Sequence, residues 1–186
     1  MSREKIKGVA IKHFNHCGYK GTSLSGIAEE VGIRKQSLAY HFPNKCELFQ
    51  EIYKEVVDKE IEFIHQYFGQ CKGKSIEEQL YDFLSQHKER FLTDHHTTLM
   101  LTTSVLMPEE LPKDVLNEPY RYIEVLTETL ESCFAKKTFR FSPMECALAF
   151  VTLIDGMNIQ LIYEGEERYE RLQKITWDIF WAGIQR

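Results

Sequence analysis

The sequence predicts an all-α protein with a small helical head at the N-terminus and a larger helical body after it. Apolar residues recur at steps of three and four along most of the chain, the spacing that places them on one face of a helix. Residues that typically begin or end helices stand between these apolar segments. Ten glycines and five prolines among 186 residues fall below the ordinary combined share of about 12%, so the helices should be long.

The head is predicted to contain three short helices. The first carries apolar positions over residues 6–17 and ends at Gly18, which can adopt a positive φ. Hydroxyl side chains at residues 22–23 can cap a second helix, which ends at Gly32. A third helix is expected over residues 34–42. Together these elements make a compact unit of about fifty residues.

The body is predicted to contain about six further helices. Ser75 with Glu78, and Ser142 with Glu145, have the spacing of capping boxes and place two of the helix starts. Pro119 is expected in the first turn of its helix, where a missing N–H costs least. The six segments are residues 44–68, 75–91, 97–107, 119–134, 142–163 and 167–185. No strand, internal repeat or low-complexity segment is evident.

Charge is distributed unevenly between the two parts. The whole chain carries 23 basic and 28 acidic residues, a net −5 that argues against general affinity for nucleic acid. Residues 1–50, however, carry eight basic and four acidic side chains, or +4, which leaves −9 for residues 51–186. Such asymmetry is typical of a polyanion-binding module attached to another domain, although charge alone fits a solvated surface equally well.

Residues 24–42 have the steric pattern of a helix-turn-helix. Ala28 is small where two helices would cross, and Gly32 permits the tight turn between them. The space between the helices would be filled by Ile27, Val31, Ile33 and Leu38. Taken alone, this spacing also fits an ordinary helical hairpin.

The residues around this pattern are more specific. Their sequence resembles the N-terminal domain of the TetR family of bacterial transcription regulators, and the resemblance covers residues 5–52 closely. It is carried by Gly21-Thr22-Ser23-Leu24-Ser25-Gly26-Ile27-Ala28 and by Gly32-Ile33-Arg34-Lys35-Gln36-Ser37-Leu38-Ala39-Tyr40-His41-Phe42-Pro43-Asn44-Lys45. The remaining residues agree with the family only in length and in their run of helices.

The resemblance implies a DNA-binding face. It implies that Ser23, Tyr40 and Lys45 touch phosphates and that Ser25, Lys35, Gln36, Ser37 and His41 lie at or beside the groove. Arg34 could pair with guanine and Gln36 with adenine, each good bidentate contact giving about 1–3 kcal/mol of discrimination.

Each of two side chains in this face has an alternative role. Arg34 fits a solvated cap residue equally well, and Tyr40 could pack in the core, although Phe42 is the better core candidate. Arg34, Gln36 and Ala39 depart from the commoner family residues at their positions, so the target sequence should differ as well.

The resemblance also implies an effector-binding and dimerisation domain over residues 47–186, after a helix-turn-helix DNA-binding domain over residues 1–46. The predicted effector pocket is Phe83, His87, Met100, Met107, Tyr122, Phe150 and Asn158. The predicted interface of a homodimer is Phe150, Leu153, Ile154, Met157, Leu161, Ile175, Ile179 and Ala182, because a terminal helical hairpin should not leave so much apolar surface in water. We expect operator DNA, a small-molecule effector and a second copy of the chain as partners.

Several other classes of protein find little support. The longest uninterrupted apolar stretch, residues 147–154, is far short of the roughly 20 residues that cross a bilayer, so we expect no membrane partner. Charges near the N-terminus argue against export and favour a cytoplasmic protein. The five cysteines are odd in number and widely spaced, so we expect reduced thiols that pack as small buried residues rather than disulfides. No nucleophile elbow, phosphate loop or zinc-protease motif is present, so we expect no enzyme activity and no cofactor.

Two alternatives stay open at this point. His13, His16 and Cys17 could fall on one helix face as metal ligands, although surface histidines are commoner than ligands and no metal is expected. The function favoured by the sequence is a ligand-responsive, sequence-specific transcriptional regulator, a repressor released from a palindromic operator by a small apolar effector. The alternative is an all-helical interaction or scaffold protein with a degenerate helix-turn-helix.

Overall fold

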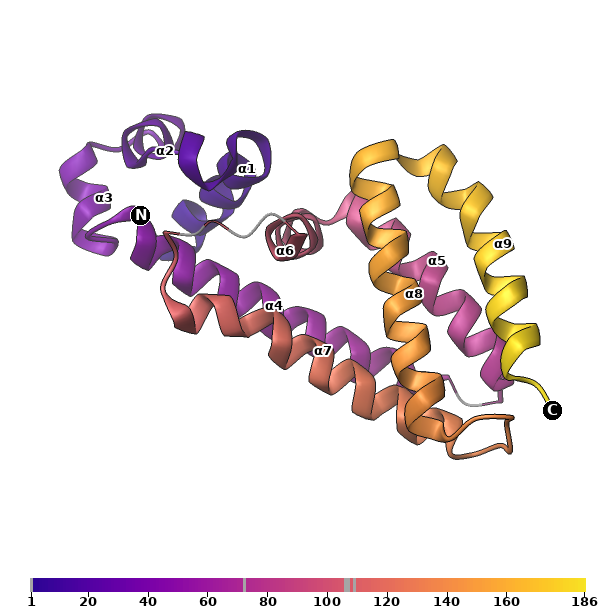
Figure 1. The fold of residues 1–186 in the computed structure, drawn as a ribbon. Coiled ribbons are helices and arrows are strands. Elements are labelled where there is room, and N and C mark those ends of the chain that lie inside the picture. Colours follow the sequence, from indigo (N-terminus) through magenta and orange to yellow (C-terminus); the bar gives the residue numbers. More distant parts are fainter. Residues whose placement is uncertain (1, 72, 106–107, 109) are drawn as a thin grey trace. The chain divides into compact units, whose positions relative to one another are not determined.

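The computed structural model describes residues 2–71, 73–105, 108 and 110–186, which form nine helices and no strand (Figure 1). This confirms the predicted all-α class. The helices are α1 (Arg3–Gly21), α2 (Leu24–Val31), α3 (Lys35–His41), α4 (Lys45–Gln70), α5 (Ile76–Thr93), α6 (His95–Val105), α7 (Lys113–Phe134), α8 (Pro143–Glu164) and α9 (Glu166–Ile184).

The chain divides into two compact units. The first comprises Met1–Lys59 and Phe91–Pro119, and the second comprises Glu60–Arg90 and Tyr120–Arg186. The first unit therefore holds the three head helices together with α6 and the initial parts of α4 and α7. The predicted boundary after residue 46 divides the chain by role rather than by compactness, and it stays a prediction.

The head is built around a small apolar core. Phe14 of α1 packs edge-on against Phe49 of α4, with ring centroids 4.9 Å apart, and Ile27 of α2 is completely buried. Gly18 has a φ of 66°, which breaks the regular helix as expected, but one further turn follows and α1 ends only at Gly21. Gly32 ends α2 in the left-handed conformation, with a φ of 80° that a β-carbon would strain.

The predicted capping boxes are confirmed. The Ser75 hydroxyl accepts a hydrogen bond from the Glu78 N–H at 3.2 Å, and the Glu78 carboxylate accepts one from the Ser75 N–H at 2.8 Å. Ser142 and Glu145 make the same reciprocal pair at the start of α8. Both pairs satisfy backbone N–H groups that the first helical turn leaves without partners.

Two helix starts were predicted too late. α7 begins at Lys113, six residues before Pro119, so this proline lies inside the helix. The buried side chain of Val115 holds the early turns in the first unit, and this packing outweighs the N–H that Pro119 lacks. α6 begins at His95 because Asp94 accepts a hydrogen bond from the His96 N–H at 2.8 Å. The predicted end of this helix at Met107 lies outside the described residues.

The core of the second unit combines α5, α8 and α9 with the end of α7. Phe150 of α8 lies among aromatic rings of α9, with centroids 5.4 Å from Phe180 and 6.1 Å from Trp177. Tyr169 of α9 is completely buried and donates a hydrogen bond from its hydroxyl to the Leu84 carbonyl at 2.9 Å. These contacts anchor α9 against both α8 and α5.

Two expectations about apolar residues need correction. Cys17 is exposed, and Cys46 and Cys71 are half-buried, so only Cys133 and Cys146 are the buried thiols expected. Within the described chain, α8 is long and apolar enough to cross a membrane by length and composition, a property that a buried core helix of a soluble protein can share. An uninterrupted apolar run was too strict a criterion, because scattered polar residues scarcely lower the mean hydropathy of a helix.

Candidate nucleic-acid interface

The short helix α3 is held in place by its two apolar residues and by the turn before it. Leu38 is completely buried and Phe42, directly after the helix, is 1% exposed. The Ile33 N–H donates to the Ala28 carbonyl at 2.9 Å, which continues the backbone bonding of α2 into the turn. The α2–α3 pair therefore has the predicted helix-turn-helix construction.

The opposite face of α3 is free. Arg34, Lys35, Gln36, Ser37 and Tyr40 are all exposed, and Tyr40 is the most exposed large apolar side chain described, at 88%. None of these five side chains has a hydrogen bond or ion pair with another described residue. Arg34 occupies the N-cap position without a side-chain capping bond, and the Tyr40 ring lies edge-on to the neighbouring His41 ring, with centroids 5.6 Å apart. Exposure rules out the alternative of Tyr40 as a core residue.

Ser23 and Lys45 carry structural roles as well. The Ser23 hydroxyl accepts a hydrogen bond from the Gly26 N–H at 3.1 Å and so caps α2. The Lys45 ammonium donates to the carbonyls of Tyr19 at 2.6 Å and Thr22 at 3.0 Å. The Ser23 hydroxyl keeps its own hydrogen for another acceptor. The Lys45 ammonium also donates to the Lys20 carbonyl at 3.5 Å, so each of its three hydrogens has an acceptor within the head. Ser25 is exposed on α2, and His41 is half-buried at the end of α3.

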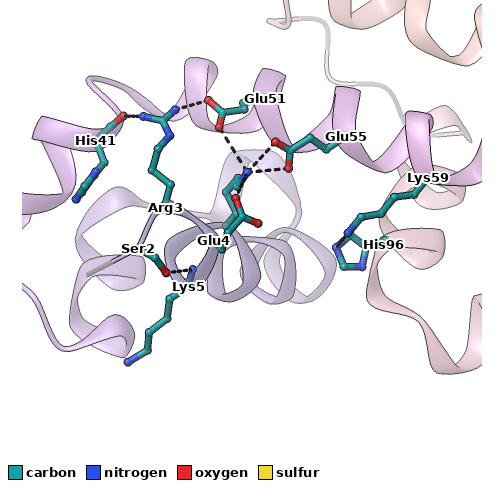
Figure 2. Close-up of polar contacts among 10 residues, drawn as sticks. Ser2, Arg3, Glu4, Lys5, His41, Glu51, Glu55, Lys59 and His96 are labelled. Carbon is teal, nitrogen blue, oxygen red and sulfur yellow. Dashed lines mark hydrogen bonds and ion pairs between the residues drawn. The ribbon is translucent and has the colours of Figure 1, made fainter.

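Arg3 was not predicted as a functional residue, yet it holds the end of α3 (Figure 2). Its guanidinium donates to the His41 carbonyl at 2.7 Å, forms an ion pair with Glu51 of α4, and lies 4.2 Å from the centroid of the Phe42 ring. These contacts satisfy a carbonyl at the C-terminus of α3 with a cation, which also suits the helix dipole. Sequence separations of 38 and 48 residues leave no local signal for them.

Beside Arg3, the nearly buried Lys7 links α1 to α4. Its ammonium lies 2.6 Å from a carboxylate oxygen of Glu4, 2.7 Å from Glu55 and 3.6 Å from Glu51. Burial acts to lower the pKa of Lys7, but the hydrogen bonds to Glu4 and Glu55 outweigh it and the pKa is raised. The three carboxylates therefore keep this buried ammonium charged.

Comparison with known proteins identifies this arrangement. The family model of the bacterial regulatory proteins of the tetR family matches residues 8–52, which contain α2, the turn and α3. A curated relative, the biofilm operon icaADBC HTH-type negative transcriptional regulator IcaR of Staphylococcus aureus strain Newman, is 29% identical over 136 residues. That match covers 72% of this chain and 68% of the relative.

Residues 8–52 therefore form a DNA-binding domain of the TetR family.

Solved structures with the same fold extend the comparison to the second unit. A putative transcriptional regulator from Saccharomonospora viridis, in complex with choline, has a TM-score of 0.76 at 20% identity, covering 99% of this chain and 97% of that one. FadR from Bacillus subtilis, in complex with stearoyl-CoA, has a TM-score of 0.74 at 17% identity, covering 99% and 100%. Together with the matched head, these comparisons show that the chain is a ligand-responsive, DNA-binding transcriptional regulator.

The residues predicted for the effector pocket are only partly brought together. Five of them lie in the second unit and are buried: Phe83, His87, Tyr122, Phe150 and Asn158. Among these, the His87 Nε2–H group donates to the Asn158 side-chain oxygen at 2.8 Å, joining α5 to α8. Met100 is buried in the first unit, and Met107 lies outside the described residues.

The residues predicted for the dimer interface fall into two groups. Phe150, Ile154, Met157 and Leu161 are each at most 3% exposed within a single chain, whereas Ile175, Ile179 and Ala182 are exposed on α9 and Leu153 is half-buried. The free apolar surface of α8 lies instead on Leu148, Ile159 and Tyr163. Sequence periodicity missed this face because α8 is apolar on most sides.

The proposed metal ligands do not converge. His13 Nε2 lies 2.7 Å from a carboxylate oxygen of Glu30, a contact that joins α1 to α2, while His16 and Cys17 are exposed. Among the residues that the structure describes, no group of three or more His, Cys, Asp or Glu side chains could hold a metal ion.

Replacing Arg3 by Met should destabilise the head, because the His41 carbonyl loses its charged donor. A hydrogen bond to a charged group contributes about 1.5–3 kcal/mol, and partial solvent exposure should reduce this to about 1 kcal/mol, or a fall of roughly 2–4 °C in Tm. Lys5→Met is the matched control, since the Lys5 side chain extends away from this network (Figure 2). Thermal unfolding measures both, and equal Tm values for the two variants would contradict the role assigned to Arg3.

His87 should make stability depend on pH. Burial lowers the pKa of its imidazole to about 4, from an ordinary 6.5, against the smaller opposing effect of the hydrogen bond with Asn158. Below pH 6.5 the unfolded chain therefore binds more protons than the folded chain. The free energy of unfolding falls as the pH drops from 6.5 towards 4, and the loss reaches about 2 kcal/mol at pH 5. His87→Gln keeps a donor to Asn158 but does not titrate. Urea unfolding at pH 7 and pH 5 should show a smaller loss in this variant than in the wild type.

Proposed function

We propose that this chain is a homodimeric repressor that binds a palindromic operator through α3 and is released by a small, largely apolar effector. The observation that carries the proposal is the exposed, unpartnered polar face of a recognition helix whose other face is completely buried. In this division of roles, residues 1–46 bind DNA, and residues 47–186 bind the effector and the second copy. The name of the Staphylococcus relative, a negative transcriptional regulator, supports repression. Such a protein acts where the operator is, in the cytoplasm.

The DNA contacts follow from the donors that the head offers. Ser23, Tyr40 and Lys45 present hydroxyl and ammonium groups suited to phosphate oxygens, and Ser25 lies two residues beyond the N-cap of α2. Phosphate contacts of this kind fix the register of a protein on the duplex. The base-reading positions are those that begin α3 or continue along it: Arg34, Gln36, Ser37 and His41. Lys35 lies beside the groove, and its ammonium suits a phosphate oxygen. Arg34 suits guanine and Gln36 suits adenine in the major groove.

The second copy is proposed to cover the apolar face of α8 and α9. Leu148, Ile159 and Tyr163 on α8, with Ile175 and Ile179 on α9, present large apolar side chains to water in the single chain. Two copies of this helix pair would form a four-helix interface with two-fold symmetry. The same symmetry places two recognition helices about 34–36 Å apart, one turn of DNA. In this arrangement one side of α8 packs in the core of its own chain, and the other side packs against the second copy.

The effector is proposed to bind inside the second unit. Phe83, Tyr122 and Phe150 offer apolar surface there, and the His87–Asn158 pair offers a neutral polar group, a combination typical of small-molecule sites. An effector that binds better to the form with low affinity for DNA must weaken DNA binding by the same factor, because linkage is reciprocal.

Base recognition can be tested on duplexes selected from a random library by the purified protein. Arg34→Ala and Gln36→Ala should each relax the preference at one position of the half-site by about 1–3 kcal/mol. Lys35→Ala is the matched comparison and should weaken all duplexes equally, reducing the salt slope by about one. Competition anisotropy measures these affinities. Unchanged base preference in both the Arg34 and Gln36 variants would remove α3 as the reading element.

Dimerisation can be tested with Ile179→Glu. Ile179 is 70% exposed in the single chain, so the change should spare the fold while placing a carboxylate in the proposed interface. Sedimentation equilibrium should show a wild-type mass of twice the 21.9 kDa chain and a shift towards the monomer in the variant. Leu92→Glu on α5 is the control and should stay dimeric. A monomeric wild type, or a variant as dimeric as the wild type, would refute the interface.

A further inference from the structure

The second unit contains a hollow of about 410 Å³ that lies between the start of α5, the end of α7 and the end of α9. None of the residues that line it belongs to the effector pocket predicted above. Its volume lies within the range of about 300–1,000 Å³ that small-molecule sites occupy. The lining residues that matter for its chemistry are Lys74, Ile76, Glu77, Cys133, Lys136 and Trp181, joined by Lys137.

The wall of this hollow is apolar. Ile76 and Trp181 supply aliphatic and aromatic surface, and Cys133 is 5% exposed. Burial raises the pKa of the Cys133 thiol, so the sulfur is neutral and contributes apolar surface rather than a nucleophile. A ligand body without charges would therefore find favourable contacts here.

The lining side chains carry an excess of positive charge. Three lysines surround the hollow against one acid, Glu77, although residues 51–186 as a whole carry a net −9. Lys74 is neutralised by an ion pair with Asp82. The Lys136 ammonium has no ion pair or hydrogen bond with any residue that the structure describes, and the Lys137 ammonium faces aromatic rings, 5.7 Å from the centroid of Trp181. Two ammonium groups are thus available to an anion.

A further unsatisfied donor lies next to Lys137. The Lys137 ammonium is 3.4 Å from the side-chain oxygen of Gln185, whose Nε2 group is buried and has no hydrogen-bond partner among the described residues. A buried donor without an acceptor costs free energy. Gln185 does not itself line the hollow, so the two ammonium groups are the donors that the hollow offers to an anion.

We propose that this hollow is a second small-molecule site, for an amphipathic anion of the medium-chain carboxylate class. Its carboxylate lies between the ammonium groups of Lys136 and Lys137, and its apolar tail lies against Ile76, Cys133 and Trp181. A bare inorganic anion lacks the apolar contacts, a neutral alcohol lacks the charge, and an organic cation meets like charges. The site is separate from the proposed effector site and does not depend on it.

Decanoate is the probe, and the emission of Trp181 is the readout. The chain has two tryptophans, so the full-length Trp177→Phe protein reports Trp181 alone. Decanoate should change its emission saturably, with an affinity at least about tenfold above those of decanol and decyltrimethylammonium. Calorimetry on the wild type should give the same order of affinities.

Two pairs of lysine variants distinguish binding in this hollow from binding elsewhere on the protein. Lys136→Gln with Lys137→Gln should weaken decanoate binding about tenfold or more, whereas Lys54→Gln with Lys113→Gln, a matched loss of two exposed lysines, should not. Equal affinity of the first pair and the wild type, equal affinity for decanol, or no saturable binding of decanoate would each overturn the proposal. Binding lost in Asn158→Leu but kept in Lys136→Gln with Lys137→Gln would also overturn it, by assigning decanoate to the interior of the unit. DNA binding is measured separately, so the proposed function and the second small-molecule site can each be refuted without the other.

Discussion

A seven-residue recognition helix cannot maintain its own position, and the head of this protein is organised around that constraint. An isolated helix of two turns is unstable in water, so α3 depends on contacts from outside itself. Leu38 and Phe42 supply the buried side, and Gly32 sets the turn before the helix. Because these contacts all come from one side, the other side of α3 stays free for a ligand as large as a DNA duplex.

The charged residues of the head divide into those that hold the structure and those left for DNA. Arg3 and Lys7 are neutralised by glutamates of α1 and α4, and Lys20 pairs with Glu110. The Lys45 ammonium donates to three carbonyls at the end of α1 and directly after it, those of Tyr19, Lys20 and Thr22. The excess of basic residues in the first fifty positions is therefore a poor measure of the charge available to phosphates. Arg34 and Lys35 form no ion pair or hydrogen bond with another described residue, so their charges stay available to DNA.

Sequence reasoning succeeded where the causes are local. The capping boxes of α5 and α8 and the positive φ of Gly32 depend on residues a few positions apart, and the structure contains all of them. The same holds for the helix-turn-helix itself, whose packing residues lie within one short segment. For this reason most of the fold and the exposed face of α3 could be predicted from the sequence.

The failures have physical causes that a sequence pattern does not contain. Pro119 suggested a helix start, but burial of Val115 extends α7 beyond it. On α8, apolar residues occur on most sides, so periodicity could not distinguish the chain's own core at Phe150 from the exposed Leu148. Arg3 acts on His41 across 38 positions of sequence, a contact that only the folded chain brings about.

The central claim is that the free face of α3 meets operator DNA, and photo-cross-linking tests it most directly. Three tyrosines, Tyr40, Tyr120 and Tyr163, are exposed by 88%, 71% and 63%, so a benzoyl-phenylalanine can replace each with little effect on packing. We predict that irradiation on the selected operator cross-links position 40 in both half-sites and leaves position 120 without a DNA adduct. Absence of an adduct at position 40, or equal adducts at positions 40 and 120, would contradict the assignment of α3 as the DNA-binding element.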